Sequence, residues 1–278
     1  MTRSHTSLNA LRRWAFERSS IFSMEPRERK GPRLFVETSS SRGDFSSDSL
    51  LTLSPSDSHY IRDVLRLRVG DPIEIGDRDS TTVYQGTIDS IDTSVSIKIL
   101  EALKEISQEI AITLVCALCK GQKNDHITDW ATELGCAHIV FFQSDRSIVR
   151  LRNSDECAHK ETRISKIATA AAQQSRQALP PQVKITLSLD EALKHLSLTP
   201  FSLKAICSLS PDAQLLSDAA KILTAGNHAC VIVGPEGDFS PEEHEKLLQN
   251  GFIPTSLGAK VLRSELAVVT ALVTIQNK

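Results

Sequence analysis

The segment with the clearest chemical signal is Gly234-Pro235-Glu236-Gly237, which follows the apolar run 229–233. In open α/β sheets, ligands bind at the carboxyl ends of the strands, where this segment would lie. Its two glycines let a ligand approach the backbone closely, and the carboxylate of Glu236 offers an anion to a cationic or hydroxyl-bearing ligand. A tight strand-to-helix connection with a surface glutamate is the alternative, and spacing alone does not decide between the two.

A second turn of this kind spans residues 257–265, before the last apolar helix of the chain. Arg263 and Glu265 place two charges beside strongly apolar sequence, and Ser264 between them is a candidate helix N-cap. An ordinary ion pair, or a glutamate favoured by the helix dipole, explains these charges as well as a binding role does. Two such turns at one edge of a sheet favour a pocket.

Other common cofactor and metal motifs are missing from the sequence. It contains no G-x-G-x-x-G fingerprint and no phosphate-binding P-loop, which argues against a nicotinamide cofactor or a nucleoside triphosphate. Cys116 and Cys119 form a C-x-x-C pair, but they lie in an expected strand, where this odd separation directs their side chains to opposite faces. No second cysteine pair or histidine pair follows at the spacing of a zinc site, so no metal is expected.

Strands and helices alternate from residue 104 onward, which predicts a mostly parallel sheet covered by helices in a domain over residues 104–278. Ser240 and Glu243, with Pro241 between them, predict a helix that begins directly after the first turn. The expected strands are 112–119, 138–144, 203–209, 229–233 and 252–257. The expected helices are 125–135, a long one that passes through 166–175, one around 218–226, one at 241–250 and a last one from Leu266.

Residues 31–103 follow a different pattern, with short β-type segments at intervals of roughly ten residues. One helical turn over 58–66 interrupts them, and Gly70-Asp71 closes it. The pattern predicts a small β-barrel or sandwich. Glycine, aspartate and serine separate the expected strands 33–37, 71–77, 82–91 and 94–100.

Bulk composition leaves the partner open. The 278 residues carry 34 acidic and 32 basic side chains, a net charge of −2, so a nucleic acid must be held by a local basic patch. The apolar runs 110–118 and 266–275 are too short for a membrane span, so no membrane partner is expected. Six cysteines, mostly beside apolar residues, indicate reduced core residues and a cytoplasmic location.

Residues 1–30 are expected to form a basic, disordered extension. The first 23 residues carry several arginines and a single acid before a second methionine, Met24. This composition is typical of an organelle-targeting peptide, but a disordered tail or an upstream start codon accounts for it as well.

Four ordered motifs resemble the ribosomal RNA small subunit methyltransferase E family of the SPOUT superfamily. They are KGQKNDHITDWATELGCAHIVFFQSDRS (120–147), KIATAAAQQS (166–175), GPEGDFSPEE (234–243) and LGAKVLRSELAVVTAL (257–272). The β domain, with HYIRDVLRLRVGD (59–71), is similar to the N-terminal PUA-like module of that family. The resemblance covers nearly the whole chain from about Arg33.

The resemblance implies an α/β fold of the SPOUT type, in which a trefoil-knotted, mostly parallel sheet with helices on both faces follows a PUA-like β-barrel. It implies S-adenosylmethionine bound in the knot loops and a homodimer with its sites at the interface. The implied reaction is methylation of N3 of one uridine near the 3′ end of 16S rRNA in the small ribosomal subunit. The residues that the resemblance assigns to the cofactor are Gly234, Pro235, Glu236, Gly237, Leu257, Gly258, Val261, Leu262 and Arg263.

The implied chemistry can be matched to residues of the second turn. Uracil N3 becomes strongly nucleophilic only when its imide proton leaves, so a base or a positive group that stabilises the anion is required. Arg263 is the candidate for the positive group, because a guanidinium stays charged and can hold two oxygens. Glu265 is the candidate base, although it could instead fix Arg263.

Basic residues for RNA phosphates are expected in both domains. Arg62 and Arg66 are one helical turn apart in the expected helix. In each domain, the alternative explanation for these basic residues is a helix face that is simply exposed to solvent. The full set of predicted RNA contacts is Arg62, Arg66, Arg68, Lys120, Lys123 and Arg146.

The sequence departs from the family pattern at several positions. Asp238 stands where many members have a glycine, and Leu266 replaces a small or hydroxyl residue. Trp130 replaces a usual lysine, and Gln173 a common glutamate, which puts a polar role of that helical surface in doubt. Two other functions stay open: a SPOUT methyltransferase for another RNA such as tRNA, and a non-catalytic RNA-binding factor for ribosome assembly.

Overall fold

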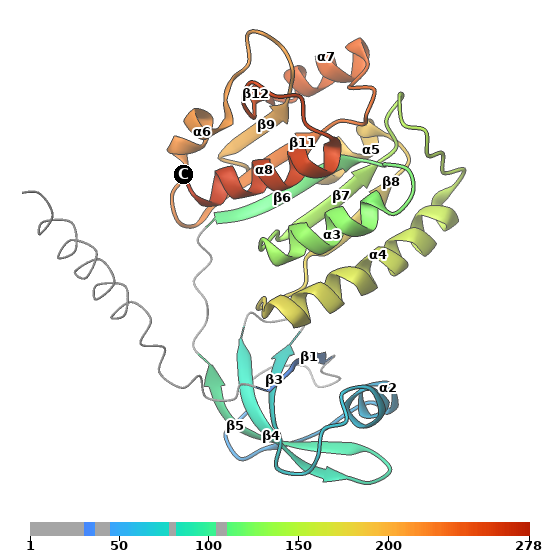
Figure 1. The fold of residues 1–278 in the computed structure, drawn as a ribbon, viewed down its shortest axis with the longest axis vertical. Coiled ribbons are helices and arrows are strands. Elements are labelled where there is room, and N and C mark those ends of the chain that lie inside the picture. Colours follow the sequence, from blue (N-terminus) through green and yellow to red (C-terminus); the bar gives the residue numbers. More distant parts are fainter. Residues whose placement is uncertain (1–30, 37–44, 78–81, 104–109) are drawn as a thin grey trace, which may run out of the picture.

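The computed structural model describes residues 31–36, 45–77, 82–103 and 110–278. The expected extension over residues 1–30 lies outside the described residues. Figure 1 shows a smaller β-rich part and a larger part in which helices surround a sheet. The two parts meet near the C-terminal end of the long helix α4 (Ser154–Ser175).

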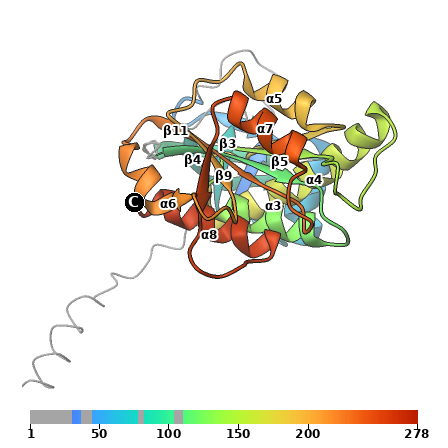
Figure 2. The same cartoon turned by 90° about the horizontal axis from the view of Figure 1, so that it is seen from above.

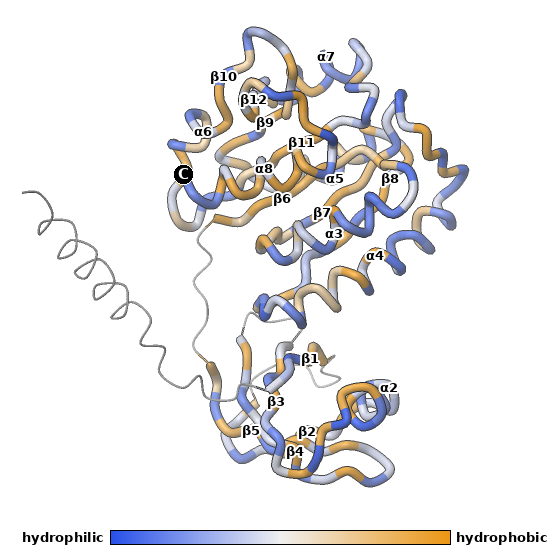
Figure 3. The backbone as a smooth tube through the Cα atoms, in the orientation of Figure 1, coloured by the Kyte–Doolittle hydropathy of each residue, from blue (hydrophilic) through white to orange (hydrophobic). Residues whose placement is uncertain are grey.

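The larger part contains a seven-stranded sheet in the order β10-β12-β9-β11-β6-β7-β8, and every neighbouring pair is parallel. The predicted parallel sheet is thereby confirmed. Parallel sheets are covered on both faces, and Figure 3 shows apolar residues concentrated along these strands. The strands are β6 (Ile110–Ala117), β7 (His138–Phe142), β8 (Gln182–Thr186), β9 (Leu203–Cys207), β10 (Gln214–Leu215), β11 (Asn227–Val233) and β12 (Ile253–Ser256).

Helices cover both faces of this sheet, as predicted (Figure 2). Phe141 packs on the face of α3, α4, α6 and α8, whereas Phe142 packs on the face of α5 and α7, because side chains alternate along a strand. None of the helices in the described part of the chain combines the length and apolar content that a membrane span requires. The helices are α3 (Lys123–Glu133), α4, α5 (Leu189–Leu196), α6 (Leu216–Ala219) with a 3-10 turn (Ala220–Ile222), α7 (Pro241–Gln249) and α8 (Ser264–Gln276).

The edge strand β8 and the helix α5 were not among the expected elements. Gln182 and Lys184 of β8 are exposed, because an edge strand has only one neighbour, so the strand lacks the apolar run of a central one. The helix α5 begins at the N-cap Ser188, whose hydroxyl accepts a hydrogen bond from the backbone N–H of Glu191 at 3.2 Å.

The expectation that Cys116 and Cys119 face opposite sides is wrong. The strand β6 ends at Ala117, so strand alternation does not extend to Cys119, and both thiols lie in one buried core. The hydrogen bond between them, together with burial, raises the pKa of Cys116. Among the residues that the structure describes, no group of His, Cys, Asp and Glu side chains is arranged to hold a metal ion.

The smaller part is a five-stranded sheet in the order β1-β3-β4-β5-β2, around a core that includes Ile73, Ile75 and Ile97. The expected helical turn is present as α2 (Pro55–His59) and a π-helical turn (Tyr60–Val64). It ends before Arg66, whose φ is +55°, so Arg62 and Arg66 do not share one continuous helix as predicted. The strands are β1 (Arg33–Val36), β2 (Leu50–Thr52), β3 (Pro72–Asp77), β4 (Val83–Ile91) and β5 (Val95–Leu103).

A cluster of charged side chains joins the two parts. Arg33 in β1 donates to Oε2 of Glu74 through Nε (2.9 Å) and Nη2 (2.6 Å), and its Nη1 donates to the carbonyl oxygens of Arg176 and Gln177 after α4 (2.6 and 2.7 Å). Arg176 donates to the other oxygen of Glu74 at 2.8 Å. Glu74 is 2% exposed. Its buried carboxylate therefore binds one guanidinium from the smaller part and one from the larger part.

Glu74→Gln is expected to lower the free energy of unfolding by about 3 kcal/mol, because it leaves the buried guanidinium of Arg33 without its counter-charge. The matched control is Asp48→Asn, which breaks the exposed pair of Asp48 with Lys98 and should leave the unfolding midpoint nearly unchanged. Urea titrations followed by circular dichroism measure both variants. Equal, small effects of the two substitutions would contradict the role of Glu74 as a buried connection between the two parts.

Candidate functional site

A cavity of about 310 Å³ lies at the carboxyl edge of the large sheet. It is lined by the turns that follow β9, β11 and β12, which are adjacent parallel strands and therefore end at the same edge. The two turns that the sequence singled out thus face one space. All of the residues predicted to bind a cofactor line this cavity except Gly237.

Gly234 and Gly258, one in each turn, have different surroundings. A Cβ added to Gly234 would lie 3.0 Å from the ring of Phe239, so a larger residue there would require that ring to shift by a few tenths of an ångström. Gly258 has a φ of +116°, and no atom lies within 4 Å of the position of its Cβ. Gly234 thus packs closely against the core, whereas the backbone at Gly258 is open to the cavity.

A hydrogen bond connects the two turns directly. The hydroxyl of Ser264, at the start of α8, donates to the carbonyl oxygen of Gly234 at 3.2 Å. Arg263, not Ser264, is the N-cap residue of α8, and its exposed side chain forms no cap hydrogen bond. The predicted N-cap therefore has another role, which is to hold the end of β11 against α8.

Lys123, at the start of α3, lies between the two predicted carboxylates. Its Nζ is 2.8 Å from Oε1 of Glu236 and 3.4 Å from Oε2 of Glu265. The hydrogen bond to Glu236 raises the pKa of Lys123. Partial burial by itself raises the pKa of Glu236, but the hydrogen bond and charge of Lys123 outweigh it and hold that pKa below the ordinary value.

This arrangement changes the expectations for two residues. Lys123 was predicted to contact RNA, but two carboxylates already share its ammonium group. Glu265 pairs with Lys123 and not with Arg263, so the ion pair offered as an alternative for Arg263 is not formed. Within the described residues, the guanidinium of Arg263 has no hydrogen bond or ion pair, and it lines the cavity.

Asn124 fixes the turn that carries Lys123, a role that was not predicted from the sequence. Its side chain is buried, accepts a hydrogen bond from the N–H of Cys119 at 2.9 Å and donates one to the carbonyl of Cys119 at 2.7 Å. Such two-way bonding satisfies a buried amide and closes the turn between β6 and α3. A buried asparagine beside a helix start could have been suspected, but not its partner.

Glu243 connects α7 to the loop that follows β7. It forms the predicted capping box with Ser240, which confirms the helix start. The same carboxylate accepts hydrogen bonds from the hydroxyl of Ser144 (2.9 Å) and the N–H of Asp145 (3.1 Å). This loop carries Arg146, which donates to the carbonyl of Gly237 at 3.0 Å.

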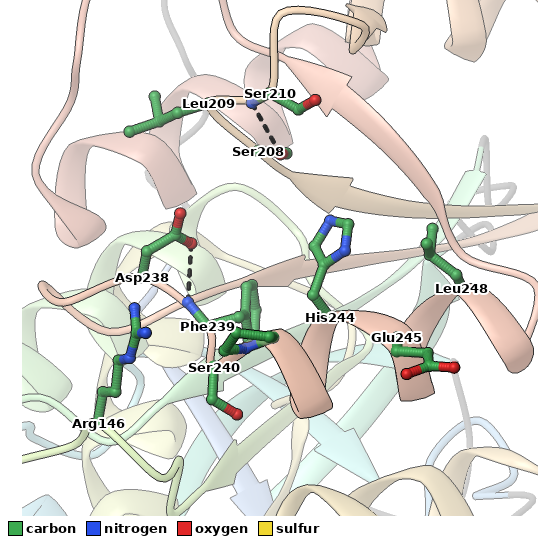
Figure 4. A pocket seen from close by; sticks show the side chains of 11 residues that line it. Arg146, Ser208, Leu209, Ser210, Asp238, Phe239, Ser240, His244, Glu245 and Leu248 are labelled. Atoms are coloured by element: carbon green, nitrogen blue, oxygen red, sulfur yellow. Dashed lines mark hydrogen bonds between the residues drawn. The ribbon is translucent and has the colours of Figure 1, made fainter.

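A second cavity, of about 560 Å³, lies between α7 and the turn after β9 (Figure 4). Arg146 and Asp238 lie near each other at one end of it. Asp238 has a φ of +60°, which explains why a glycine suits this position in similar sequences. Ser208, Leu209 and Asp238 line both cavities, so the two spaces adjoin.

The other predicted RNA contacts fall into two groups. Arg62, Arg66 and Arg68 are exposed on the smaller part, where Arg62 also pairs with Asp63 at 3.2 Å. Lys120 and Arg146 are exposed at the carboxyl edge of the large sheet. Trp130, one of the departures, is half-buried on α3 and stacks on His126 with ring centroids 5.5 Å apart.

Comparison with known proteins gives the class of this fold and site. Residues 107–276 match the family model of an RNA methyltransferase domain, and residues 53–100 match that of an RNA methyltransferase PUA domain. The first match spans more than half of the chain, so the chain belongs to this family of RNA methyltransferases. The smaller part is the PUA-like domain that the resemblance predicted.

The relatives confirm the particular family that the motifs indicated. Proteins named ribosomal RNA small subunit methyltransferase E from Buchnera aphidicola and Bacillus subtilis are 25% and 26% identical to this chain. The alignments cover 90% and 86% of this chain, and 95% and 94% of those proteins.

Solved structures agree in fold. A methyltransferase of Legionella pneumophila, in complex with its bound cofactor SAM, is 26% identical, with a TM-score of 0.75 over 89% of this chain and 98% of that one. Ribosomal RNA small subunit methyltransferase E from Neisseria gonorrhoeae, bound to S-adenosyl methionine, is 24% identical, with a TM-score of 0.75 over 89% and 97% of the two chains.

Glu243→Ala is expected to destabilise the protein by about 3 kcal/mol, because it leaves the buried donors of Ser144 and Ser240, and the partly buried N–H of Asp145, without their acceptor. Glu191→Ala is the matched control, because Glu191 also accepts a backbone N–H at a helix start but is exposed. We expect a loss of about 1 kcal/mol there. Denaturant unfolding compares the two, and a loss at Glu243 no larger than at Glu191 would contradict its role as a connection between loops.

Proposed function

We propose that this protein transfers the methyl group of S-adenosylmethionine to small-subunit ribosomal RNA, at N3 of a uridine near the 3′ end of 16S rRNA, on the assembled subunit. The proposal depends mainly on the cavity at the carboxyl edge, where the turns after β11 and β12 place Glu236, Gly258 and Arg263 around one space. Relatives named for this rRNA, and a 26% identical methyltransferase solved with bound SAM, support the substrate and the cofactor.

The residues of the cavity fit S-adenosylmethionine. Its volume of about 310 Å³ is within the usual range for small-molecule sites. Leu257, Val261 and Leu262 supply apolar contacts for an adenine ring, and the open side of Gly258 leaves the backbone accessible. When bound there, S-adenosylmethionine supplies a methyl group on a sulfonium.

The protein has to favour the anionic form of the acceptor. Arg263 lines the cavity with an uncommitted guanidinium, so we assign it the stabilisation of charge that develops on uracil when N3 loses its proton. Glu265 shares Lys123 with Glu236, and we therefore assign it the positioning of Lys123 instead of proton removal. The residues that we propose to contact RNA phosphates are Arg62, Arg66, Arg68, Lys120 and Arg146.

The trefoil knot and the homodimer belong to the same proposal. The strand β12 pairs on the far side of β9 from β11, and α8 then returns to pack on α3, β6 and β11, which supports a knotted path. Val261, Leu266 and Val273 are exposed apolar residues on α8 and the turn before it. They support a second copy of the chain as the partner of this surface.

The test is to incubate purified protein and S-adenosylmethionine with small subunits from a strain that lacks the enzyme, and to map the modified base by mass spectrometry. We expect one methyl group at N3 of a uridine near the 3′ end of 16S rRNA. Methylation of tRNA instead would identify another RNA target. If calorimetry detects no binding of S-adenosylmethionine, the protein would instead be a non-catalytic assembly factor.

Arg263→Lys is expected to lower turnover by about two to three decades, because lysine keeps the charge but loses the two-point geometry. Activity should partly recover as the pH rises, since more uracil is then already ionised. Single-turnover methylation across alkaline pH measures both effects. The melting temperature should not change, because Arg263 makes no ion pair within the described residues. Parallel pH profiles with a lower melting temperature would show a structural role only.

A further inference from the structure

The contact between the two parts of the molecule is narrow and polar. Among the elements that the structure describes, α4 and β1 make the most extensive contact between the larger and the smaller part. The charged cluster of Arg33, Glu74 and Arg176 lies in this contact, and Arg176 also donates to the carbonyl oxygen of Gly31 at 3.2 Å. Two domains are expected to move relative to each other unless their interface is large and hydrophobic. The charged cluster is therefore the feature that holds the two parts at one angle.

The backbone of Arg176 is in a conformation that favours glycine. It is the C-cap residue of α4, with a φ of +59° and a ψ of 35°. Glycine is the usual residue at such a left-handed helix end, and a larger residue costs backbone energy there. A glycine would end α4 equally well, but it could not reach Glu74, to which the guanidinium of Arg176 donates at 2.8 Å. The arginine at this position thus serves the contact between the two parts and not the helix.

The helix α4 separates two groups of exposed cations. Its 22 residues give it a length of about 33 Å. It begins after the loop that carries Arg146, at the carboxyl edge of the large sheet, and it ends at Arg176 in the charged cluster. The smaller part carries its own exposed cations, Arg62, Arg66 and Arg68, in the segment after α2. In Figure 1, α2 and the loop after β7 lie on the same side of the molecule, to the right. The angle between the two parts therefore decides how the two groups of cations face one ligand.

We propose that Glu74 and Arg176 are positioning residues for RNA binding, which fix the smaller part so that its arginines and the cations of the carboxyl edge bind one RNA molecule together. This inference rests on the proposed function, and it concerns the binding of the substrate and not the transfer of the methyl group. When two phosphate-binding surfaces belong to one rigid body, the second surface is already in place once the first has bound. A loose connection would have to be ordered at each binding event, which weakens affinity. Neither positioning residue has to touch RNA.

Arg176→Gly tests the positioning role with little other change. It removes the guanidinium but suits the left-handed backbone, so folding and S-adenosylmethionine affinity should be preserved. We expect KM for small subunits to rise about tenfold, with kcat nearly unchanged, because the bound complex is the same once it has formed. The matched control is Arg163→Ala, which also removes one positive charge from α4 but breaks an ion pair with Asp125 inside the larger part. Equal KM values for Arg176→Gly, Arg163→Ala and the wild type would overturn the inference.

The salt dependence of binding separates a positioning residue from a phosphate contact. Loss of a phosphate contact reduces the slope of log K against log salt concentration by about 1, and Arg68→Gln should show this reduction. Arg176→Gly should weaken binding at every salt concentration without changing the slope, because all phosphate contacts still form. A reduced slope for Arg176→Gly would show that Arg176 itself contacts RNA, and would overturn its assignment as a positioning residue. A lower melting temperature with an unchanged KM would leave it a structural role only.

A double-mutant cycle tests whether Glu74 and Arg176 act through the same connection. Glu74→Gln alone should also raise KM for small subunits, measured below its lowered melting temperature. Because both substitutions break one connection, Glu74→Gln combined with Arg176→Gly should raise KM no further than Glu74→Gln alone. If the two effects multiply, the residues act independently, and the charged cluster does not position the smaller part.

The wild-type protein separates this inference from the proposed function. If it binds S-adenosylmethionine and methylates small subunits while Arg176→Gly has the same KM, only the positioning role is wrong. If the wild type neither binds nor methylates small subunits, the proposed function fails, and the positioning role fails with it.

Discussion

The parallel pairing of β12, β9 and β11 is the constraint on which the site depends. These strands run in one direction and lie side by side, so the turns that follow them end at a single edge of the sheet. Residues that are far apart in the sequence, such as Cys207, Gly234 and Leu262, line one cavity for this reason. An antiparallel strand among the three would send its turn to the opposite edge, and the cavity would lose one wall.

Turns that meet at an edge still have to be held in place, and buried polar side chains hold them. Asn124 closes the turn before α3, Ser264 connects α8 to the end of β11, and Glu243 connects α7 to the loop after β7. Each bond satisfies a group that would otherwise be buried without a partner. The charged residues Lys123 and Arg146 are therefore mounted on fixed backbone, although they lie near the surface.

The PUA-like part is oriented by charge as well as by packing. Glu74 binds Arg33 from its own part and Arg176 from the end of α4, and Arg33 also binds carbonyl oxygens of the larger part. Buried ion pairs contribute little net stability, but they tolerate few other arrangements of their donors. The charged cluster of Arg33, Glu74 and Arg176 thus sets the orientation of the smaller part. It thereby sets the direction in which its exposed arginines face relative to the carboxyl edge of the large sheet.

Local sequence signals predicted a large part of the fold and of the site. The capping box of Ser240 and Glu243 marked the start of α7, and the apolar runs marked β6, β7, β9 and β11. The edge strand β8 was not predicted, because two of its five residues are exposed and it lacks an apolar run. The turn at 234–237 and the charges Arg263 and Glu265 were likewise identified from residue type and position.

The sequence by itself determined which segments become strands, helices and turns, because apolar periodicity and capping act between near neighbours. Only the tertiary structure decided which turns share a cavity and which charges pair. Lys123 and Glu236 are 113 positions apart, and nothing near either residue specifies the other as its partner. That pairing follows from the order of strands in the sheet, which depends on the packing of the whole domain and not on any local pattern.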